Sequence, residues 1–477
     1  MAQVETVTAN NWTPKGEVEV YGPDRPQHRK QLVFFGGIPG ERAQVKVTSV
    51  GKNRAYGFWV DSEQPSPVRV TPPCEKFGPC GGCPLMHVTP KAASEIKRDM
   101  MANTLREAGL GDVPIGKWHD CPDGQENFRH VVKIGWGRSD KGRIRLGAWG
   151  RNQRHIIPIP HCNVATPTLR RAMNALAHHA IEMELWPWER QTGAGVMRSA
   201  VLRQSRTTGE IMVTLIAGKR IRQLTDYAEA IANGVSEVVG VWLHVNDDPG
   251  NSIYVRDGDG VLGVRALCGK ATIDEELNGI RYGIGPGDFF QTNPSVAEVL
   301  YARTIERLQL EEGVPVLDLF CGVGGFALQA ARVTGWALGI EDIDSAVQRA
   351  REAARRNEIR GAEFLSDRVD LALPDLQKRL GKKRPVITVN PPRRGLEPSV
   401  IEGMLALNPR KIAYISCGAR ALARDLAIFR TAGFDIGEVE LFDMFPNTAH
   451  YESLTVLTAP DADSVTSRAP RRKVVRK

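Results

Sequence analysis

The C-terminal part of the chain alternates short apolar segments with helical ones, and this alternation restricts the possible folds more than any other feature. Apolar segments of strand length occupy residues 314–320, 336–340, 386–389 and 411–416. Between them, residues 344–357 carry apolar side chains at helical spacing and begin at an aspartate that we expect to be the N-cap. Strands that alternate with helices predict a doubly wound α/β domain with a parallel sheet.

A glycine-rich turn follows the first of these strands and opens a helix, in the sequence DLFCGVGGF from residue 318. Gly322 and Gly324 allow a ligand to approach the backbone closely. Glu341 follows the next strand, where a carboxylate can accept hydrogen bonds from a ribose diol. Such turns also occur in nicotinamide enzymes, but a complete G-x-G-x-x-G is missing here.

Two later residues extend this predicted cofactor site. Asn390 opens the sequence NPPR after a further strand, which favours S-adenosylmethionine as the cofactor. Asp367 lies where it can reach an adenine edge, although a solvated loop aspartate explains it equally well. Cys321, within the glycine-rich turn, is most simply a small packing residue.

Cys417 and Glu452 form a pair suited to carbon methylation of a pyrimidine. Uracil C5 is too weak a nucleophile to attack a methyl sulfonium unaided. A thiolate that adds to C6 makes C5 nucleophilic, and a carboxylate must then remove the C5 proton so that the thiol can leave. We therefore expect Cys417 to be the nucleophile, with its pKa lowered by the site, and Glu452 to be the proton acceptor.

Three cysteines in the sequence CEKFGPCGGC, namely Cys74, Cys80 and Cys83, indicate a metal site. Soft thiol ligands on glycine-rich backbone fit either zinc or an iron–sulfur cluster, and the spacing does not separate the two. A fourth ligand is required. Cys162, in a loop-like sequence, is the best candidate, and Cys121 is the competitor.

The N-terminal region predicts a small β-barrel. Short segments rich in β-forming residues lie at 18–20, 31–35, 44–50 and 56–60, with glycine and proline between them. Basic side chains lie beside aromatic ones here, which suits stacking of bases on an OB-like surface. The alternative is that these aromatics fill the barrel core.

The middle of the chain mixes helices and strands. Thr166 and Pro167 predict the start of a helix, as an N-cap followed by a proline in the first turn. Residues 196–204 and 211–217 read as a β-hairpin. We therefore expect an α+β domain between the barrel and the C-terminal sheet.

The overall composition indicates a polyanionic partner and no membrane. The chain has 477 residues, a net charge of +8 and a pI of about 9.1. No apolar run approaches the ~20 residues of a membrane-spanning helix, and the first residues show no secretory pattern. We expect a cytoplasmic protein, in which eight cysteines favour metal binding or catalysis over disulfides. A basic tail is either a solvated end or a nucleic-acid tether.

These motifs together resemble the RNA 5-methyluridine methyltransferases, particularly the iron–sulfur branch that modifies 23S ribosomal RNA. The resemblance covers nearly the whole chain. It implies S-adenosylmethionine as the cofactor, a [4Fe–4S] cluster on the four cysteines, and ribosomal RNA as the partner, with no obligate protein partner. It also implies cofactor contacts from Gln291, in GDFFQTN, and from Phe320, and it matches Glu341, Cys417 and Glu452 to the family's ribose ligand, nucleophile and base.

The resemblance also gives the expected domains. These are a TRAM-like RNA-binding barrel at 13–70, a central α+β domain with the cluster at 71–285, a Rossmann-like methyltransferase domain at 286–460, and a basic, disordered tail at 461–477. The cluster is expected to be structural or to position RNA, since the reaction has no redox step.

Two departures from the family pattern leave alternatives open. Asn390 stands where the family usually has aspartate, and Gly325 stands where asparagine is common. An asparagine before two prolines is typical of amino-group methyltransferases, so N-methylation of a base or protein amine is one alternative. Methylation of cytosine C5 is a closer variant. A non-catalytic RNA-binding protein built on a methyltransferase is the third.

Overall fold

The computed structural model describes residues 4–21, 31–151, 155–189, 191–248, 250, 252–257 and 261–460. The expected basic tail at 461–477 lies outside the described residues. Backbone contacts divide the chain into two compact units. Unit 1 comprises Met1–Met100, Trp118–Val299 and Phe442–Tyr451, and unit 2 comprises Met101–Lys117, Leu300–Leu441 and Glu452–Lys477.

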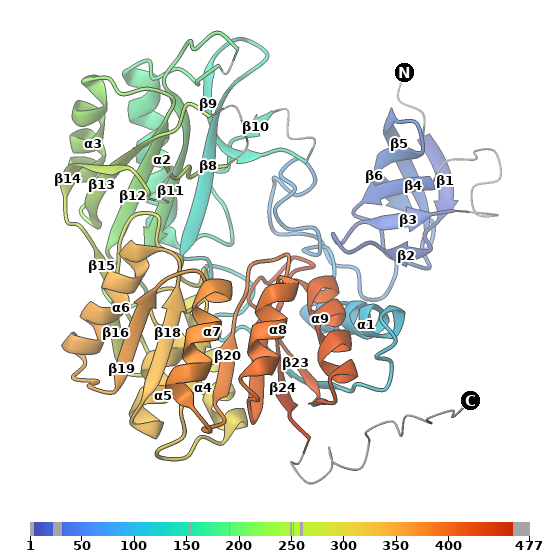
Figure 1. The fold of residues 1–477 in the computed structure, drawn as a ribbon. Coiled ribbons are helices and arrows are strands. Elements are labelled where there is room, and N and C mark those ends of the chain that lie inside the picture. The colour runs from blue at the N-terminus through green and yellow to red at the C-terminus, as the bar shows by residue number, and fades with distance from the viewer. Residues whose placement is uncertain are drawn as a thin grey trace, which may run out of the picture. The chain divides into compact units, whose positions relative to one another are not determined.

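Unit 1 begins with a six-stranded sheet in the order β1-β5-β6-β4-β3-β2, which curls around its own core (Figure 1). Its strands are β1 (Val4–Thr8), β2 (Asn11–Trp12), β3 (Val18–Val20), β4 (Gln31–Phe35), β5 (Arg42–Val50) and β6 (Arg54–Ser62). Along β5, Ala43, Val45 and Val47 alternate with exposed residues and face the core, as a half-buried strand requires. The sheet extends beyond the expected range of 13–70, because β1 pairs with β5.

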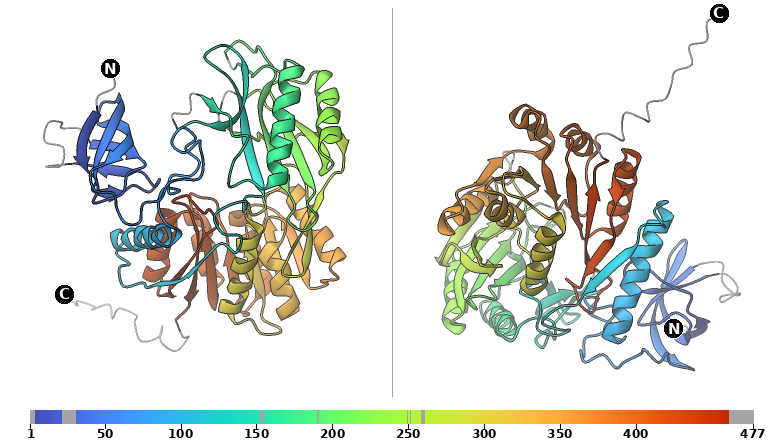
Figure 2. Two further views of the ribbon diagram at one scale, coloured as in Figure 1. Left: turned by 180° about the vertical axis from the view of Figure 1, so that it is seen from behind. Right: turned by 90° about the horizontal axis from the view of Figure 1, so that it is seen from below.

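A second sheet in unit 1 has seven strands in the order β10-β9-β8-β11-β12-β13-β14. They are β8 (Val131–Arg138), β9 (Ile144–Trp149), β10 (Ile156–Ile157), β11 (Met197–Gln204), β12 (Ile211–Ala217), β13 (Val238–Val245) and β14 (Val264–Gly269). Helices α2 (Pro167–Glu182) and α3 (Gln223–Gly234) lie side by side on one face (Figure 2). The predicted β-hairpin is confirmed as the antiparallel pair of β11 and β12. The predicted N-cap is confirmed as well, because the Thr166 hydroxyl accepts a hydrogen bond from the Leu169 N–H at 3.2 Å.

Four further elements complete this part of the chain. Helix α1 (Pro90–Glu107) and strand β7 (Ile115–His119) each extend across a border between the units. Strands β15 (Ile273–Leu277) and β16 (Ile280–Ile284) form a separate antiparallel pair within unit 1.

Unit 2 is built on an α/β sheet, as the alternating pattern predicts. Its strand order is β19-β18-β17-β20-β21-β24-β23-β7, with β22 also paired to β24. The strands are β17 (Val316–Leu319), β18 (Ala337–Glu341), β19 (Ala362–Ser366), β20 (Val386–Val389), β21 (Lys411–Ser416), β22 (Asp435–Ile436), β23 (Val439–Phe442) and β24 (Glu452–Thr458). Strands β17 to β21 are parallel, whereas β24 is antiparallel to β21.

Helices cover both faces of this sheet (Figures 1 and 2). They are α4 (Pro294–Leu308), α5 (Gly325–Thr334), α6 (Asp344–Arg356), α7 (Val369–Leu380), α8 (Pro398–Ala406) and α9 (Ala419–Thr431). The expected cap on α6 is wrong: Ile343 is the N-cap, and Asp344 is the first helical residue. No helix in the described part of the chain is both long and apolar enough to cross a membrane.

The strand order of unit 2 determines where a ligand can bind. From β17 the chain runs outward through β18 and β19, and it then returns to the other side of β17 with β20 and β21. Ligands of doubly wound sheets bind beyond the carboxyl ends of the strands, at this point of reversal. The turns after β17, β18, β19, β20 and β21 carry most of the predicted site residues.

Candidate active site and cysteine cavity

The turn between β17 and α5 is bent by three residues with a left-handed backbone. Phe320 has φ 61°, Gly322 has φ 54° and Gly324 has φ 87°. A side chain at Gly324 is excluded twice, because its Cβ would lie 2.9 Å from the ring of Phe364 and because L-residues rarely adopt this φ. The turn therefore presents the backbone of Gly322 and Gly324, next to the half-buried Phe320, at the carboxyl end of β17.

A buried aspartate fixes this turn to the neighbouring strand. Asp318 accepts hydrogen bonds from the Ala327 N–H and from the Thr388 hydroxyl, both at 2.8 Å. Burial raises the pKa of Asp318 to about 7, although these hydrogen bonds act to lower it. The contacts connect β17, α5 and β20, so Asp318 keeps the turn at a fixed position at the point of strand reversal.

Glu341, at the end of β18, is bound to the same turn. Its carboxylate accepts hydrogen bonds from the Gly322 N–H at 3.0 Å and the Ile343 N–H at 3.2 Å. Burial and the adjacent Asp342 raise the pKa of Glu341 to about 7. A carboxylate has about four acceptor positions, and the two backbone bonds occupy only part of them.

Asp367 and Asn390 lie at the ends of the next strands. The Asp367 N–H donates to the Glu341 carbonyl at 3.0 Å, and its half-buried carboxylate accepts from the Arg368 N–H at 2.7 Å. Asn390 directly follows β20 and is half-buried. Both residues thus share the sheet edge at which Glu341 and the glycine turn lie.

Tyr301 explains the glycine at position 325. A Cβ on Gly325 would lie 2.8 Å from the Tyr301 hydroxyl and 2.9 Å from its ring. The same ring packs against Phe326, with 4.4 Å between the ring centroids. A side chain of α4 therefore occupies the space that an asparagine at 325 would need. Cys321 is buried beside Gly339, in agreement with a packing role.

The pairing of β21 with β24 brings Cys417 and Glu452 together. Ser416 lies opposite Ser453 in this antiparallel register, and the Ser453 hydroxyl donates to the Ser416 carbonyl at 2.8 Å. Cys417 follows the last residue of β21, and Glu452 is the first residue of β24. Two residues 35 positions apart are thereby neighbours at one sheet edge.

Glu452 is an unusual carboxylate. It is 5% exposed, and its Oε2 atom is buried without a hydrogen-bond partner among the described residues. Burial raises the pKa of Glu452 to about 8, while the positive charge of Arg393 acts to lower it. A buried acid with such a pKa is matched to proton transfer near neutral pH.

The thiol of Cys417 differs from expectation. Burial raises its pKa, and the carboxylate of Glu452 raises it further. Arg393 opposes both effects through its charge and a hydrogen bond to the sulfur, but it does not outweigh them. The prediction of a lowered thiol pKa is therefore wrong for this site.

Arg393 is the site residue that sequence reasoning missed. It interacts with both Cys417 and Glu452, and it is exposed. The signal was present, since Arg393 ends the NPPR sequence that begins at Asn390.

Gln291, in unit 1, is buried in a segment whose backbone is well fixed. Arg203 donates to the carbonyls of Asp288 and Phe290 at 3.2 and 3.3 Å, and the His130 N–H donates to the Thr292 carbonyl at 3.1 Å. These bonds hold the backbone on both sides of Gln291, which is 4% exposed.

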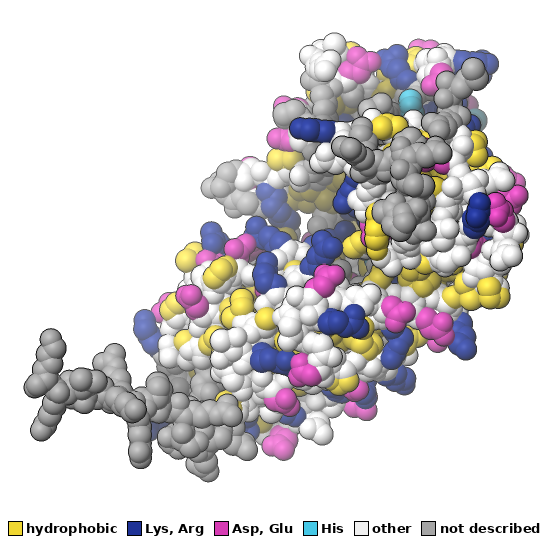
Figure 3. All heavy atoms as spheres, turned by 90° about the vertical axis from the view of Figure 1, so that its right-hand side faces the viewer, with side chains coloured by type: hydrophobic (Ala, Val, Ile, Leu, Met, Phe, Trp, Pro, Cys, Tyr) yellow, Lys and Arg dark blue, Asp and Glu magenta, His cyan; other side chains and the backbone are white. Residues whose placement is uncertain are grey.

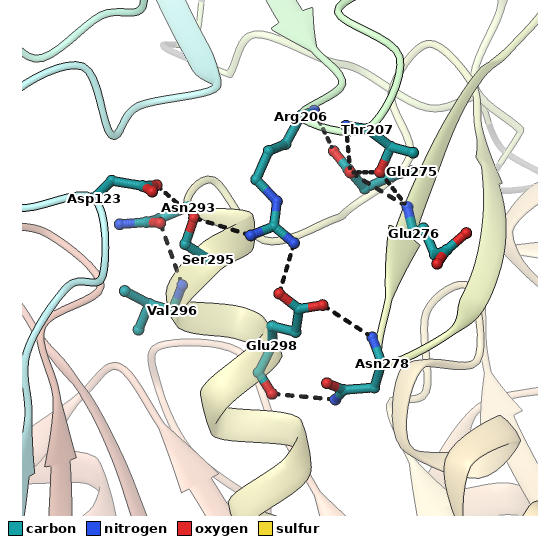
Figure 4. A network of polar contacts seen from close by, with 10 residues as sticks. All are labelled: Asp123, Arg206, Thr207, Glu275, Glu276, Asn278, Asn293, Ser295, Val296 and Glu298. Atoms are coloured by element: carbon teal, nitrogen blue, oxygen red, sulfur yellow. Dashed lines mark hydrogen bonds and ion pairs between the residues drawn. The ribbon is translucent and has the colours of Figure 1, made fainter.

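A polar network continues from this segment into the first turn of α4 (Figure 4). Arg206 donates to the Glu298 carboxylate at 2.6 Å and to the Ser295 hydroxyl at 3.3 Å. Asn278 donates to the Glu298 carbonyl at 3.1 Å, and the Asn293 side chain accepts from the N–H of Val296 at 3.4 Å. The network orders the chain immediately after Gln291.

The four predicted metal ligands of unit 1 line one cavity of about 280 Å³. They are Cys74, Cys80, Cys83 and Cys162. Burial, followed by the charges of Cys162 and Cys80, raises the pKa of Cys83 to about 12. Cys121 does not line this cavity: it is buried elsewhere, with the Asn293 amide 3.2 Å from its sulfur.

The spacing of these thiols is wide. In the described part of the chain, only His178, His179 and Glu182 bring three ligand atoms within 4.8 Å of one another, so no three of the four sulfurs do. Those three residues lie on the surface of α2, where both histidines pair with Glu182.

Comparison with known proteins gives consistent matches. Residues 269–459 match the sequence model of the tRNA (uracil-5-)-methyltransferase family. An uncharacterized RNA methyltransferase of Listeria innocua is 30% identical over 437 residues, which cover 90% of this chain and 92% of that protein. A second, from Caldanaerobacter subterraneus, is 30% identical over 425 residues, with 88% and 92% covered.

A solved structure shares the fold. The tRNA (uracil-54, C5)-methyltransferase of Pyrococcus abyssi, in complex with S-adenosyl-L-homocysteine, superposes with a TM-score of 0.72 and 24% identity. The superposition covers 95% of this chain and 100% of that one. At this identity the likeness concerns the fold alone.

Proposed function

The chain belongs to the RNA (uracil-5-)-methyltransferase family, and we propose that this S-adenosylmethionine-dependent RNA methyltransferase acts on C5 of uridine. The observation that carries the proposal is the juxtaposition of Cys417 and Glu452 beside Arg393. A thiol, a buried base and a cation at one sheet edge are the groups that covalent activation of a pyrimidine needs.

The turn after β17 and the ends of the neighbouring strands fit S-adenosylmethionine. Glu341 would accept hydrogen bonds from the ribose, Asp367 would face the adenine edge, and Phe320 would lie against the cofactor. The backbone of Gly322 and Gly324 leaves room for its approach, and Gln291 would add a further contact. When bound, the cofactor supplies an electrophilic methyl group on a positively charged sulfur.

Cys417 would begin the reaction on the uracil ring. Its thiolate adds to C6, and the electron pair of the C5–C6 double bond makes C5 nucleophilic. Arg393 would stabilise the thiolate, since its charge and hydrogen bond already oppose the high pKa of the thiol. Asn390 would hydrogen-bond the pyrimidine or the reacting end of the cofactor, because its amide offers both a donor and an acceptor.

Glu452 would complete the reaction after C5 has received the methyl group. The carboxylate takes the proton from C5, the electrons of the broken C–H bond re-form the C5–C6 double bond, and the C6–S bond breaks. Cys417 leaves as the thiolate. N-methylation through Asn390 leaves this buried carboxylate without a role, and so does a non-catalytic protein.

The RNA surface that we propose is a cleft of unit 1 with a volume of about 570 Å³. Tyr56 and Trp149 line it and are 42% and 53% exposed. Lys15 adds positive charge, whereas Arg151 is paired with Glu17 in the same cleft. Exposed aromatics beside cations suit stacking of unpaired bases. On the face shown in Figure 3, lysine and arginine side chains are mixed with acidic ones, so local shape matters more than one broad charged patch.

For the RNA itself, we propose 23S ribosomal RNA, on the strength of the resemblance to the iron–sulfur branch and of the cysteine set. The first sheet of unit 1 would act as the TRAM-like domain. The target base must leave any stack to reach Cys417.

A [4Fe–4S] cluster fits the cysteine cavity better than one zinc ion. Tetrahedral zinc with Zn–S bonds of ~2.3 Å would draw four sulfurs to about 3.8 Å from one another. The four thiols are spaced more widely around a common cavity. The cluster would be held by Cys74, Cys80, Cys83 and Cys162, and it would stabilise the loops beside the RNA cleft.

Nucleoside analysis tests the proposed reaction. RNA from cells with and without the protein is digested, and its modified nucleosides are measured by mass spectrometry. Loss of one 5-methyluridine, restored by wild type but not by Cys417→Ala, is expected. Loss of an N-methylated nucleoside or of 5-methylcytidine would instead establish one of the alternatives.

A further inference from the structure

The residues immediately before Glu452 belong to a different compact unit from Glu452 itself. Residues 442–451, here called the base-carrying segment, pack within unit 1. Glu452 follows directly and opens β24, in the sheet of unit 2. The proposed base therefore directly follows a segment whose own contacts lie within unit 1.

A buried lysine holds the start of this segment. Lys97, on α1, is 1% exposed, and its Nζ donates to Asp443 at 2.6 Å and to the Phe445 carbonyl at 3.2 Å. Lysine is rarely buried this deeply, and a buried charge is tolerated only when it is paired. The Asp443 N–H also donates to the His119 carbonyl at 2.9 Å, so both the side chain and the backbone of Asp443 are fixed.

A second set of contacts holds the end of the segment. Asn447 adopts a left-handed backbone with φ 64°. Its amide donates to the Gln125 carbonyl at 2.8 Å, and its carbonyl accepts from the Leu85 N–H at 2.9 Å. Within the segment, the Thr448 hydroxyl donates to the Phe445 carbonyl at 2.8 Å. The segment is thus anchored through its backbone.

Glu452 depends on this backbone for its position. Its Oε2 atom has no hydrogen-bond partner in the described part of the chain, so no hydrogen bond orients that oxygen. A base must lie within about 3 Å of the proton that it removes. The position of this carboxylate is therefore set by the main chain, through the pairing of β24 with β21 and through the segment that leads into β24.

We propose that Lys97 is a positioning residue for the proton-abstraction step. By neutralising Asp443 and binding the Phe445 carbonyl, it fixes the base-carrying segment and, through the main chain, the carboxylate of Glu452. This inference rests on the proposed function. Addition of Cys417 to C6 and methylation of C5 do not use the base, so they are spared when Lys97 is changed.

A specific kinetic signature follows. With a displaced carboxylate, the C5–H bond persists, the C6–S bond cannot break, and the methylated RNA stays attached to Cys417. Misplacement by about 1 Å can slow a step by roughly 100-fold. A merely destabilised protein would instead lose all steps together and would accumulate no adduct.

The test compares Lys97→Met with a matched control. Arg69→Met breaks another buried ion pair of unit 1, that of Arg69 with Glu41, whose side chains are 12% and 1% exposed. Asp443→Asn is the milder second variant, because its side chain keeps an oxygen that can accept a hydrogen bond from Lys97. It serves as the test if Lys97→Met does not fold. Ordinary uridine RNA and S-adenosylmethionine are supplied, and the covalent adduct is measured on denaturing gels beside the turnover rate.

Turnover of Lys97→Met is expected to fall about 10- to 100-fold, while the adduct becomes a major fraction of the enzyme. Asp443→Asn should show the same pattern more weakly, and Arg69→Met should show no adduct. Loss of turnover without adduct, or equal adduct in Arg69→Met, would overturn the role of Lys97. Wild type is first trapped with 5-fluorouridine RNA, so absence of that trapped species overturns the proposed function itself.

Discussion

At the scale of single residues, burial raises the pKa of the Glu452 carboxylate into the range useful for proton transfer, and it lowers the stability of the fold once the carboxylate ionises. Its folded-state pKa of about 8 lies above the ordinary value of 4.5, because burial disfavours the charged form. A group whose pKa rises on folding stabilises the protein fully below its unfolded pKa. That contribution is lost as the pH rises through the folded value. Stability is therefore lost progressively between about pH 4.5 and about pH 8, and the full loss applies above that range.

Glu452→Gln is expected to be more thermostable than wild type, and increasingly so with pH. The neutral amide has the same shape and does not ionise. The difference in Tm should grow by about 2–5 °C between pH 6 and pH 9, as measured by differential scanning fluorimetry. A difference independent of pH would show that Glu452 does not titrate in this range.

Arg393 should set the pH at which the enzyme becomes active. Both Cys417 and Glu452 must lose a proton to act, and Arg393 lowers the pKa of each. Wild-type kcat/KM should rise with pH as the Cys417 thiol loses its proton, at a pH above the ordinary range of a thiol because burial raises its pKa. Arg393→Gln should move this rise to higher pH and lower the activity at pH 7 by about 10-fold or more.

The neighbouring Arg394 provides the control. It pairs with Glu397 on the surface, and both side chains are largely exposed. Arg394→Gln should leave the pH profile in place. An unshifted profile in Arg393→Gln would remove the electrostatic role assigned to Arg393.

The sequence predicted the chemical identity of these residues but not their protonation. Cys417 and Glu452 were chosen because thiol and carboxylate together suit C5 methylation. Their pKa values depend on how deeply β21 and β24 are buried, and on an arginine from the turn after β20. No local pattern reports burial of that kind, which explains why the thiol pKa was predicted in the wrong direction and Arg393 was not assigned.

At the scale of secondary-structure elements, the glycine turn packs closely against α4, because Gly325 leaves room for the ring of Tyr301. Gly325→Ala places a Cβ against the Tyr301 ring and should lower stability by about 1–3 kcal/mol, with weaker binding of S-adenosylmethionine. The double variant Gly325→Ala with Tyr301→Leu should lose less than the sum of the two single changes. Chemical denaturation and calorimetric titration of the cofactor measure both effects, and strict additivity would contradict this packing.

Elements with a strong local signal were predicted well. The hairpin of β11 and β12, the capped start of α2 and the parallel strands of unit 2 follow from periodicity and from turn residues. Features that depend on pairing between segments far apart in the sequence were not predicted. Strand β1 joins the first sheet only through β5, and the cap of α6 is displaced by one residue because the turn after β18 is fixed by Glu341.

At the scale of the whole molecule, the two compact units are not consecutive in the chain. The expected domains run in sequence, whereas residues 101–117 pack with unit 2 and residues 442–451 pack with unit 1. Such exchanges come from tertiary contacts like that of Lys97 with Asp443, between residues far apart in the sequence. Composition and periodicity do not reveal them.

The cysteine cavity gives a prediction for the intact protein. Purified without oxygen, wild type should contain about four iron atoms and four acid-labile sulfides per chain. Cys162→Ser should lose them and become less stable. Cys121→Ser should retain them, because Cys121 lies outside the cavity. Stoichiometric zinc in wild type, or iron retained in Cys162→Ser, would contradict the assignment.

The central claim is that Cys417 forms a covalent bond to a uridine during methyl transfer. Fluorine at C5 cannot be removed as a proton, so 5-fluorouridine RNA should halt the reaction at the adduct. With methyl-labelled S-adenosylmethionine, wild type is predicted to give one denaturation-resistant protein–RNA species that carries the label, and Cys417→Ala none. Labelled RNA released without such a species, or an undiminished adduct in Cys417→Ala, would contradict the mechanism.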